Sequence, residues 1–184
     1  MSAADGPALG LIELCSIARG MRVCDAMVKR SPVKLLKART THPGKYLIIV
    51  RGGVDEVKES VGAGMAVCGD ALVDHLILPF PHSELEAVLV SPQSPTLNSL
   101  GVIETFSVAS TIRAADVALK RAAVSAVRLG LADDLGGKGY FVFTGALHDV
   151  EEAMEAGCEA VGQGLLAGRE TIANPHPDLS EGLD

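Results

Sequence analysis

Four cysteines are the first residues of this 184-residue chain that could hold a metal or carry redox chemistry: Cys15, Cys24, Cys68 and Cys158. Zinc and iron–sulfur sites draw on closely spaced cysteines or on mixed cysteine and histidine clusters. No two of these four form a Cys-x-x-Cys pair, and none has the spacing of zinc ligands. The cysteines therefore predict no metal centre.

The histidines and glycines give no more support to catalysis. The five histidines, His42, His75, His82, His148 and His176, lie in no Ser/His/Asp motif context. Gly136-Gly137 falls within an expected hairpin and not between a strand and a helix, where a phosphate-binding loop would lie. We therefore expect that the protein is not an enzyme and that it needs no cofactor.

Composition excludes two further classes of function. The net charge is −7, aromatic residues make up 3% of the chain, and no lysine- or arginine-rich stripe is present. Nucleic-acid binding needs basic surface and often stacking side chains, so none is expected. No charge-free apolar run of membrane-spanning length occurs, and the first ten residues do not resemble a signal peptide. We expect a cytoplasmic protein without a membrane partner.

An internal repeat organises the chain. Residues 9–13 read LGLIE and residues 100–104 read LGVIE, an offset of 91. The offset relates Asp25 to Asp116 and Lys29 to Lys120, and it becomes 93 after an insertion of two residues in the second copy. A repeat of this length indicates two copies of one structural module.

The repeat also predicts buried faces. One face of a helix is expected in each copy, at Ile17, Met21, Cys24 and Val28 and at Val108, Ile112, Ala115 and Leu119. Each cysteine corresponds to an apolar residue of the other copy, namely Phe106, Ala115, Val161 and Met65. Because a free cysteine behaves as a small apolar residue, we expect all four to pack in the core.

Each copy predicts the same order of elements. In the first copy we expect strands at 9–14, 33–41, 46–51 and 76–78, and helices at 16–30 and 55–68, with a brief helix after Pro81. Ser16 and Ser107 are expected N-caps. The order is βαββαβ, so the fold class is α/β (α+β), with two tandem ferredoxin-like modules. The expected boundaries are 8–90 for the first module, 91–99 for the linker and 99–177 for the second module.

These segments resemble a known family. LGLIELCSIARGMRVCDAMVKRSPV, followed by RGGV after the third strand, is similar to the shell-protein domain of bacterial microcompartments. The second copy repeats the pattern as LGVIETFSVASTIRAADVALKRAAV. The strand-first order in both copies is that of the non-permuted tandem class, similar to its propanediol-utilisation-type subunit.

The resemblance implies an assembly. Single-domain members of the family form flat hexamers that pack edge to edge, and tandem members make the same plate from three chains. We therefore expect a homotrimeric pseudohexamer with a central pore, a structural tile that contacts other shell tiles and passes small metabolites. Lys29 and Lys120 match the family's lysine at the tile edge. Their alternative role is to complement a helix dipole at the helix end.

The resemblance also places the turn between the second and third strands at the pore. The pore-lining residues would be Thr41, His42, Pro43 and Gly44 with Asp134, Leu135, Gly136 and Gly137. Three His42 side chains would resist being charged together, and could bind an anion or hold a metal ion. His42 is the one candidate metal ligand. The simpler interpretation is that His42 is an exposed loop residue with no ligand role.

Two other functions stay open at this point. An electron-transfer subunit would bind an iron–sulfur or other metal centre on the threefold axis. The resembling subunit uses a cysteine for this purpose where this chain has His42, and imidazoles alone are poor substitutes for thiolates. A small-molecule-sensing regulator would need a ligand pocket that the sequence does not indicate.

Overall fold

The computed structural model describes residues 6–133 and 135–182. The chain divides into two compact units. The first unit comprises residues up to Pro81 together with Ala132–Gly137, and the second comprises His82–Leu131 and the residues from Lys138 onward. Within the described residues, no helix has both the length and the apolar character needed to span a bilayer.

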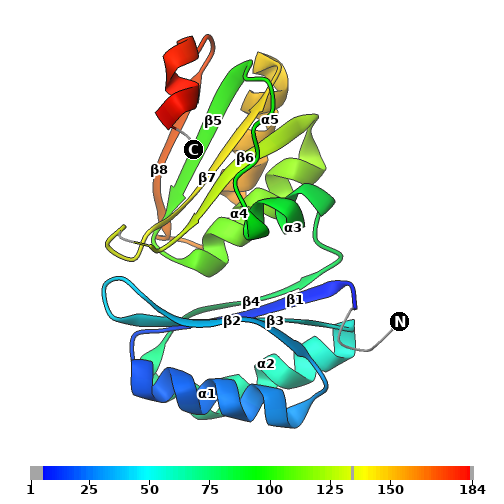
Figure 1. Ribbon diagram of the computed structural model, residues 1–184, viewed down its shortest axis with the longest axis vertical. Coiled ribbons are helices and arrows are strands. Elements are labelled where there is room, and N and C mark those ends of the chain that lie inside the picture. Colours follow the sequence, from blue (N-terminus) through cyan, green and yellow to red (C-terminus); the bar gives the residue numbers. More distant parts are fainter. Residues whose placement is uncertain (1–5, 134, 183–184) are drawn as a thin grey trace. The chain divides into compact units, whose positions relative to one another are not determined.

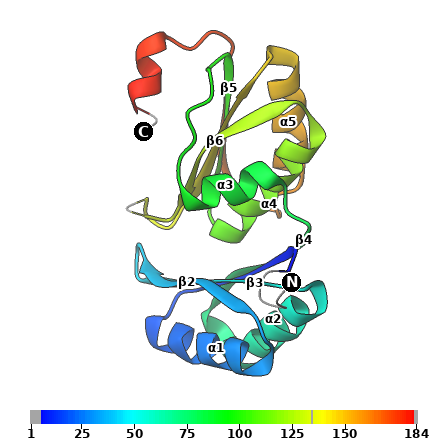
Figure 2. The ribbon, with the colours of Figure 1, turned by 45° about the vertical axis from the view of Figure 1, so that its right-hand side comes forward.

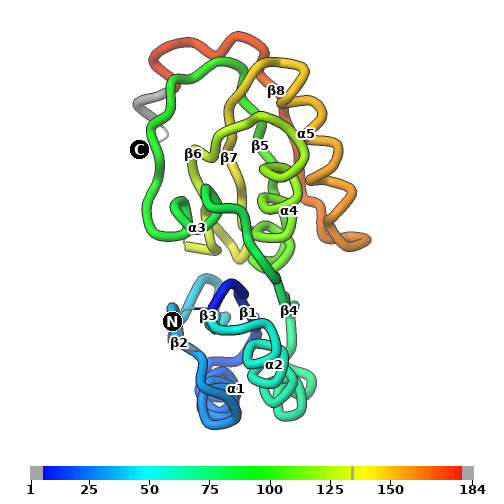
Figure 3. The backbone as a smooth tube through the Cα atoms, turned by 90° about the vertical axis from the view of Figure 1, so that its right-hand side faces the viewer, coloured from blue at the N-terminus to red at the C-terminus, as the bar shows by residue number. Residues whose placement is uncertain are grey.

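The first unit is one antiparallel sheet with two helices on one of its faces (Figures 1 and 3). Its elements are β1 (Ala8–Leu14), α1 (Ile17–Arg30), β2 (Lys34–Thr41), β3 (Lys45–Gly52), α2 (Val54–Cys68) and β4 (Leu72–Pro79). The strand order is β2-β3-β1-β4, and neighbouring strands are antiparallel. This is the ferredoxin-like βαββαβ arrangement predicted from the sequence.

The second unit repeats this arrangement and adds two short helices. Its elements are α3 (Ser83–Val90), β5 (Ser99–Thr105), α4 (Val108–Arg121), β6 (Val124–Leu131), β7 (Gly139–Gly145), α5 (Leu147–Glu159), β8 (Leu166–Ile172) and the 3₁₀ helix η3 (Pro177–Gly182). The strand order is β6-β7-β5-β8, with the same antiparallel pairing. Two copies of one module are thereby confirmed.

The local signals in the sequence are realised at the helix starts. The hydroxyl of Ser16 accepts a hydrogen bond from the Arg19 N–H, and that of Ser107 accepts one from the Ser110 N–H. The fourth strand is longer than the predicted 76–78, because β4 pairs with β1 along its whole length. The polar residues Asp74 and His75 led to a predicted strand that was too short, because an edge strand can carry polar side chains.

The predicted buried face of α1 is wrong. The residues that face the core are Gly20, Val23 and Met27. Gly20 allows this contact, since a Cβ there would lie 2.5 Å from the Tyr46 Cβ. Cys24 packs at the margin of the core. Ile17, Met21 and Val28, which we expected to be buried, stay substantially exposed.

The same face of α4 is buried as predicted. Val108, Ile112, Ala115 and Leu119 are all buried. Helix α3 packs against both α4 and β6, and it supplies a cover that α1 lacks in the first unit (Figure 2). Identical periodicity therefore leads to different burial because the two helices have different neighbours.

Aromatic packing distinguishes the core of the second unit. Phe141 and Phe143 are fully buried on β7, with ring centroids 5.1 Å apart. Gly101 of β5 makes room for them, because a Cβ at that position would lie 2.3 Å from the Phe143 ring. In the first unit the positions of these two rings are taken by Ile48 and Val50, which are smaller.

Candidate functional site

The turn between β2 and β3 has the tight geometry that the sequence predicts. Strand β2 ends at Thr41, and the Gly44 N–H donates a hydrogen bond to the Thr41 carbonyl at 3.0 Å. Gly44 has a φ of 91°, in the left-handed region that favours glycine. His42 and Pro43 are thus held at the tip of a closed hairpin.

The second turn, between β6 and β7, is longer, and residues 132–137 group with the first unit. Gly136 and Gly137 have φ values of 60° and 87°. Leu135 is 37% exposed, and Asp134 lies outside the described residues. The His42 N–H donates to the Ala132 carbonyl at 3.2 Å. Residues of both predicted pore turns therefore lie together.

An ion pair joins these two segments. The guanidinium of Arg39 donates to both carboxylate oxygens of Asp133, with one Nη2–Oδ2 distance of 2.7 Å. The hydrogen bond from Arg39 lowers the pKa of the Asp133 carboxyl, with smaller contributions from the charges of Lys37 and His42. A lowered folded-state pKa stabilises the fold above the carboxyl's unfolded pKa, and this contribution is lost as the pH falls through the folded pKa. The connection between the turns should weaken only in acid.

A second connection lies deeper. Lys45 Nζ donates to Glu13 Oε1 at 2.8 Å and to the Gly137 carbonyl at 3.1 Å. Glu13 and Glu104 hold the same position in the two copies of the repeat. Both accept from a lysine, since Lys138 Nζ lies 3.2 Å from Glu104 Oε2. Gly137 fits closely here, because a Cβ would come within 3.0 Å of the Pro43 Cδ.

The remaining histidines occupy structural or surface positions. His82 Nδ1 accepts from the Glu84 N–H, and His176 Nδ1 accepts from the Asp178 N–H, each at 3.3 Å. Both imidazoles therefore accept a backbone hydrogen bond at the start of a helix, α3 for His82 and η3 for His176. His148 is exposed in the first turn of α5. Within the described part of the single chain, no group of three or more metal-ligating side chains comes together.

The cysteines follow the core prediction only in part. Cys68 is buried, whereas Cys24 and Cys158 are half-buried. Burial raises the pKa of both half-buried thiols, with Asp25 adding to the effect at Cys24. Cys15 is exposed, so its predicted core position is wrong. Its counterpart Phe106 is also exposed, which shows that an apolar counterpart need not be a buried one.

The two predicted edge lysines lie in the last turns of α1 and α4. Lys29 Nζ lies 2.7 Å from Asp25 Oδ2, and Lys120 Nζ lies 2.6 Å from Asp116 Oδ2. Each pair spans one helical turn, and both ammonium groups remain partly exposed. Each unit therefore carries an equivalent lysine, paired with an aspartate, near the end of its first long helix.

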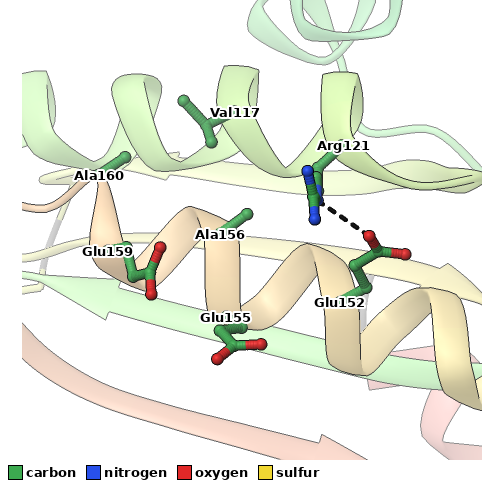
Figure 4. A pocket seen from close by; sticks show the side chains of 7 residues that line it. All are labelled: Val117, Arg121, Glu152, Glu155, Ala156, Glu159 and Ala160. Carbon is green, nitrogen blue, oxygen red and sulfur yellow. Dashed lines mark ion pairs between the residues drawn. The ribbon is translucent and has the colours of Figure 1, made fainter.

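The grooves between paired helices offer no reactive arrangement. In the second unit a groove runs between α4 and α5, and the side chains that line it are drawn in Figure 4. Glu152, Glu155 and Glu159 line it, and Arg121 forms an ion pair with Glu152. The first unit has the corresponding pair, Arg30 with Glu59. Because the same ion pair links the two helices in both units, its role is structural.

Comparison with known proteins gives matches along both modules. The family model described as the BMC domain matches residues 8–81 and again 99–175. The chain is 41% identical over 174 residues to the bacterial microcompartment shell protein PduT of Citrobacter freundii, covering 94% of this chain and 95% of that protein. It is 38% identical over 86 residues to the carboxysome shell protein CcmK2 of Synechococcus elongatus, covering 45% of this chain and 84% of that protein.

A solved structure matches both modules of the chain. The crystal structure of a microcompartment protein from Desulfitobacterium hafniense superposes with a TM-score of 0.84 at 37% sequence identity. The match covers 95% of this chain and 98% of that one.

Proposed function

The chain belongs to the BMC domain family, whose domain it carries twice, and we propose that three copies of it close into a pseudohexameric plate in the shell of a bacterial microcompartment. The observation that carries this proposal is the match of both modules, in tandem and in strand-first order, to a shell protein along almost the full length of each chain. The proposed partners are further copies of the chain, other shell tiles at the plate edge, and small metabolites in the pore.

Trimerisation is the first expectation of this proposal. Three chains supply the six modules that one plate needs, and closed rotational symmetry is the usual way to bury self-complementary surface. Native mass spectrometry should give a trimer, and electron microscopy at high protein concentration should show flat sheets. A chain that stays monomeric or dimeric under these conditions would contradict the proposed plate.

The pore is proposed to lie where the two turns meet. Contacts within the first unit bring His42 to the loop 132–137. Arg39 bonds to Asp133 near one end of this loop, and Lys45 bonds to the Gly137 carbonyl at the other end. In a trimer three copies of each turn would then alternate around one axis. His42 and Leu135 would alternate at the narrowest ring, so that a polar and an apolar side chain together set its width.

The His42→Ala variant should widen this ring. Removing three imidazoles takes away both bulk and hydrogen-bonding groups, so anion occupancy at the axis should fall. Crystal structures of the parent and the variant trimer, with bromide present, measure ring width and anion occupancy. Leu135→Ala is the matched control, since it widens the ring but keeps the imidazoles. His42 side chains directed away from the threefold axis would contradict the assignment.

An electron-transfer role at the same axis has weaker support. The two turns contain no cysteine, and three imidazoles are a poor donor set for an iron–sulfur cluster. The described residues therefore do not fit such a cluster. Iron analysis of the purified trimer separates the two roles, and we expect no stoichiometric iron.

A further inference from the structure

The first unit has an uncovered apolar surface on α1 and β2. We call it the α1–β2 patch, and its members are Ile17, Met21, Val28 and Leu35, which are between 38% and 59% exposed. Their counterparts in the second unit, at an offset of 91, are Val108, Ile112, Leu119 and Ala126, which are at most 4% exposed. The repeat therefore shows the same surface once covered and once bare.

Helix α3 covers this surface in the second unit. Leu85 of α3 is fully buried and Val88 is 4% exposed. The His82 N–H donates to Asp116 Oδ1 at 2.8 Å, and the Glu84 carboxylate accepts from the Ala126 N–H at 2.7 Å. Two buried apolar side chains and two hydrogen bonds thus hold the helix on α4 and β6. Since α3 precedes the second copy of the repeat, the first module supplies the cover for the second.

The C-terminal segment repeats the start of α3. Residues 81–85 read PHSEL and residues 175–179 read PHPDL. His82 and His176 accept the same local hydrogen bond through Nδ1. Leu179, the counterpart of the buried Leu85, is 39% exposed. Residues 175–179 therefore repeat the start of α3 without its burial.

We infer that residues 175–179 of one chain dock on the α1–β2 patch of a second copy. Asp25 would take the place of Asp116 as acceptor for the His176 N–H. The Leu35 N–H would take the place of that of Ala126, with Asp178 as its acceptor. This backbone position is comparable in both units, because both edge strands carry a bulge at the same point, before Lys37 in β2 and before Arg128 in β6.

Charge complementarity favours the same partner. The final eleven residues contain three acidic residues, Asp178, Glu181 and Asp184, and no lysine or arginine. Strand β2 carries Lys34, Lys37 and Arg39 and no acidic residue. Opposite charges on segment and surface promote encounter and fix the docking direction.

The occupant is a second copy because the segment and the patch both belong to this sequence: PHPDL at 175–179 repeats the PHSEL of α3, and its acidic charge complements the basic residues of β2. In the second unit α3 already packs on the corresponding face of α4 and β6. A segment-to-face contact of this kind is heterologous, so its repetition closes a ring when the rotation permits. The inference rests on the proposed trimer and names the contact that would close it.

Two variants that are each defective on one side test the contact. Leu179→Asp removes the segment's anchor and Met21→Asp places a carboxylate on the patch, while Leu147→Asp alters an equally exposed leucine elsewhere in the second unit. By native mass spectrometry and sedimentation, we expect each of the first two to raise the trimer dissociation constant at least tenfold. Leu147→Asp should match the parent.

Mixing the two variants distinguishes a lost contact from a misfolded chain. One variant keeps an intact patch and the other an intact segment, so an equimolar mixture should form a 1:1 heterodimer through a single good contact. A parent trimer with an unimpaired Leu179→Asp variant would overturn the inference and leave the proposed plate standing. A mixture that stays monomeric would overturn it too. A monomeric parent would contradict the plate itself.

Thiol labelling gives a second measurement that needs no substitution in the patch. Cys24 lies beside the patch and its counterpart Ala115 is fully buried. In the parent trimer, maleimide should modify Cys24 at least tenfold more slowly than in a chain ending at Asn174, which keeps all of β8. Equal rates in the two proteins would overturn the inference.

Discussion

Replacement of Glu13 by alanine is expected to lower the free energy of unfolding by about 2–4 kcal/mol. The Glu13 side chain is fully buried, and its partner Lys45 is 15% exposed at a distance of 2.8 Å. Removing one member of a buried pair leaves the other charge without compensation, which costs about 3–5 kcal/mol. We expect a smaller loss because the Lys45 ammonium retains some exposure and keeps the Gly137 carbonyl as acceptor.

The second unit supplies the matched control. Glu104 pairs with Lys138 at 3.2 Å, but the two side chains are 44% and 46% exposed. Exposed pairs contribute little, so Glu104→Ala should cost less than about 1 kcal/mol. Denaturant unfolding of both variants at one protein concentration measures the difference. Comparable losses for Glu13→Ala and Glu104→Ala would contradict the role assigned to burial.

The repeat made much of the fold predictable. Two copies of the same alternation of apolar residues had to form the same sheet, and both sheets have the predicted βαββαβ topology. The serine caps and the glycines with positive φ also follow from local chemistry, since each acts within a few residues. The repeat relates Glu13 to Glu104, but it does not indicate that only Glu13 is buried.

Burial of α1 could not be predicted in the same way. Periodicity identifies an apolar stripe, but it does not say which neighbour covers that stripe. On α4 the neighbour is α3, while on α1 the core contact shifts to Gly20, which lets the helix approach Tyr46. Met21 was predicted to be buried and is exposed. An apolar stripe that its own chain leaves exposed indicates a docking surface for a second chain.

Contacts between distant loops were also beyond sequence reasoning. Arg39 and Asp133 are 94 residues apart, and no pattern in the repeat pairs them. Asp133 lies where the second copy differs in length from the first, so it has no clear counterpart. Opposite charges beside the two turns were the one available signal. Charges of both signs occur throughout the chain, so this signal alone could not select the pair.

Simultaneous replacement of Lys29 and Lys120 by aspartate should abolish sheet formation while the trimer remains. Lys29 is 72% exposed, and its pair with Asp25 spans a single helical turn. An exposed pair of this kind contributes about 0.3–0.5 kcal/mol, so the fold should tolerate the loss of the Lys29–Asp25 pair. The effect on sheet formation should be far larger than the effect on stability. Each substitution occurs three times per trimeric plate, so every contact between neighbouring plates would contain a replaced lysine.

The two lysines should not contribute equally to stability, which makes the assembly effect separable from folding. Asp116 is 4% exposed and also accepts from the His82 N–H, so Lys120→Asp places a second carboxylate beside a nearly buried one. Asp25 is 59% exposed, and Lys29→Asp is the milder change. Electron microscopy should therefore show sheets impaired by Lys29→Asp alone, at unchanged trimer mass. Lys58→Asp, on an exposed lysine of α2, is the control and should leave sheets intact. Sheets as extensive in the Lys29 and Lys120 double variant as in the parent would show that these lysines only complement the helix dipole.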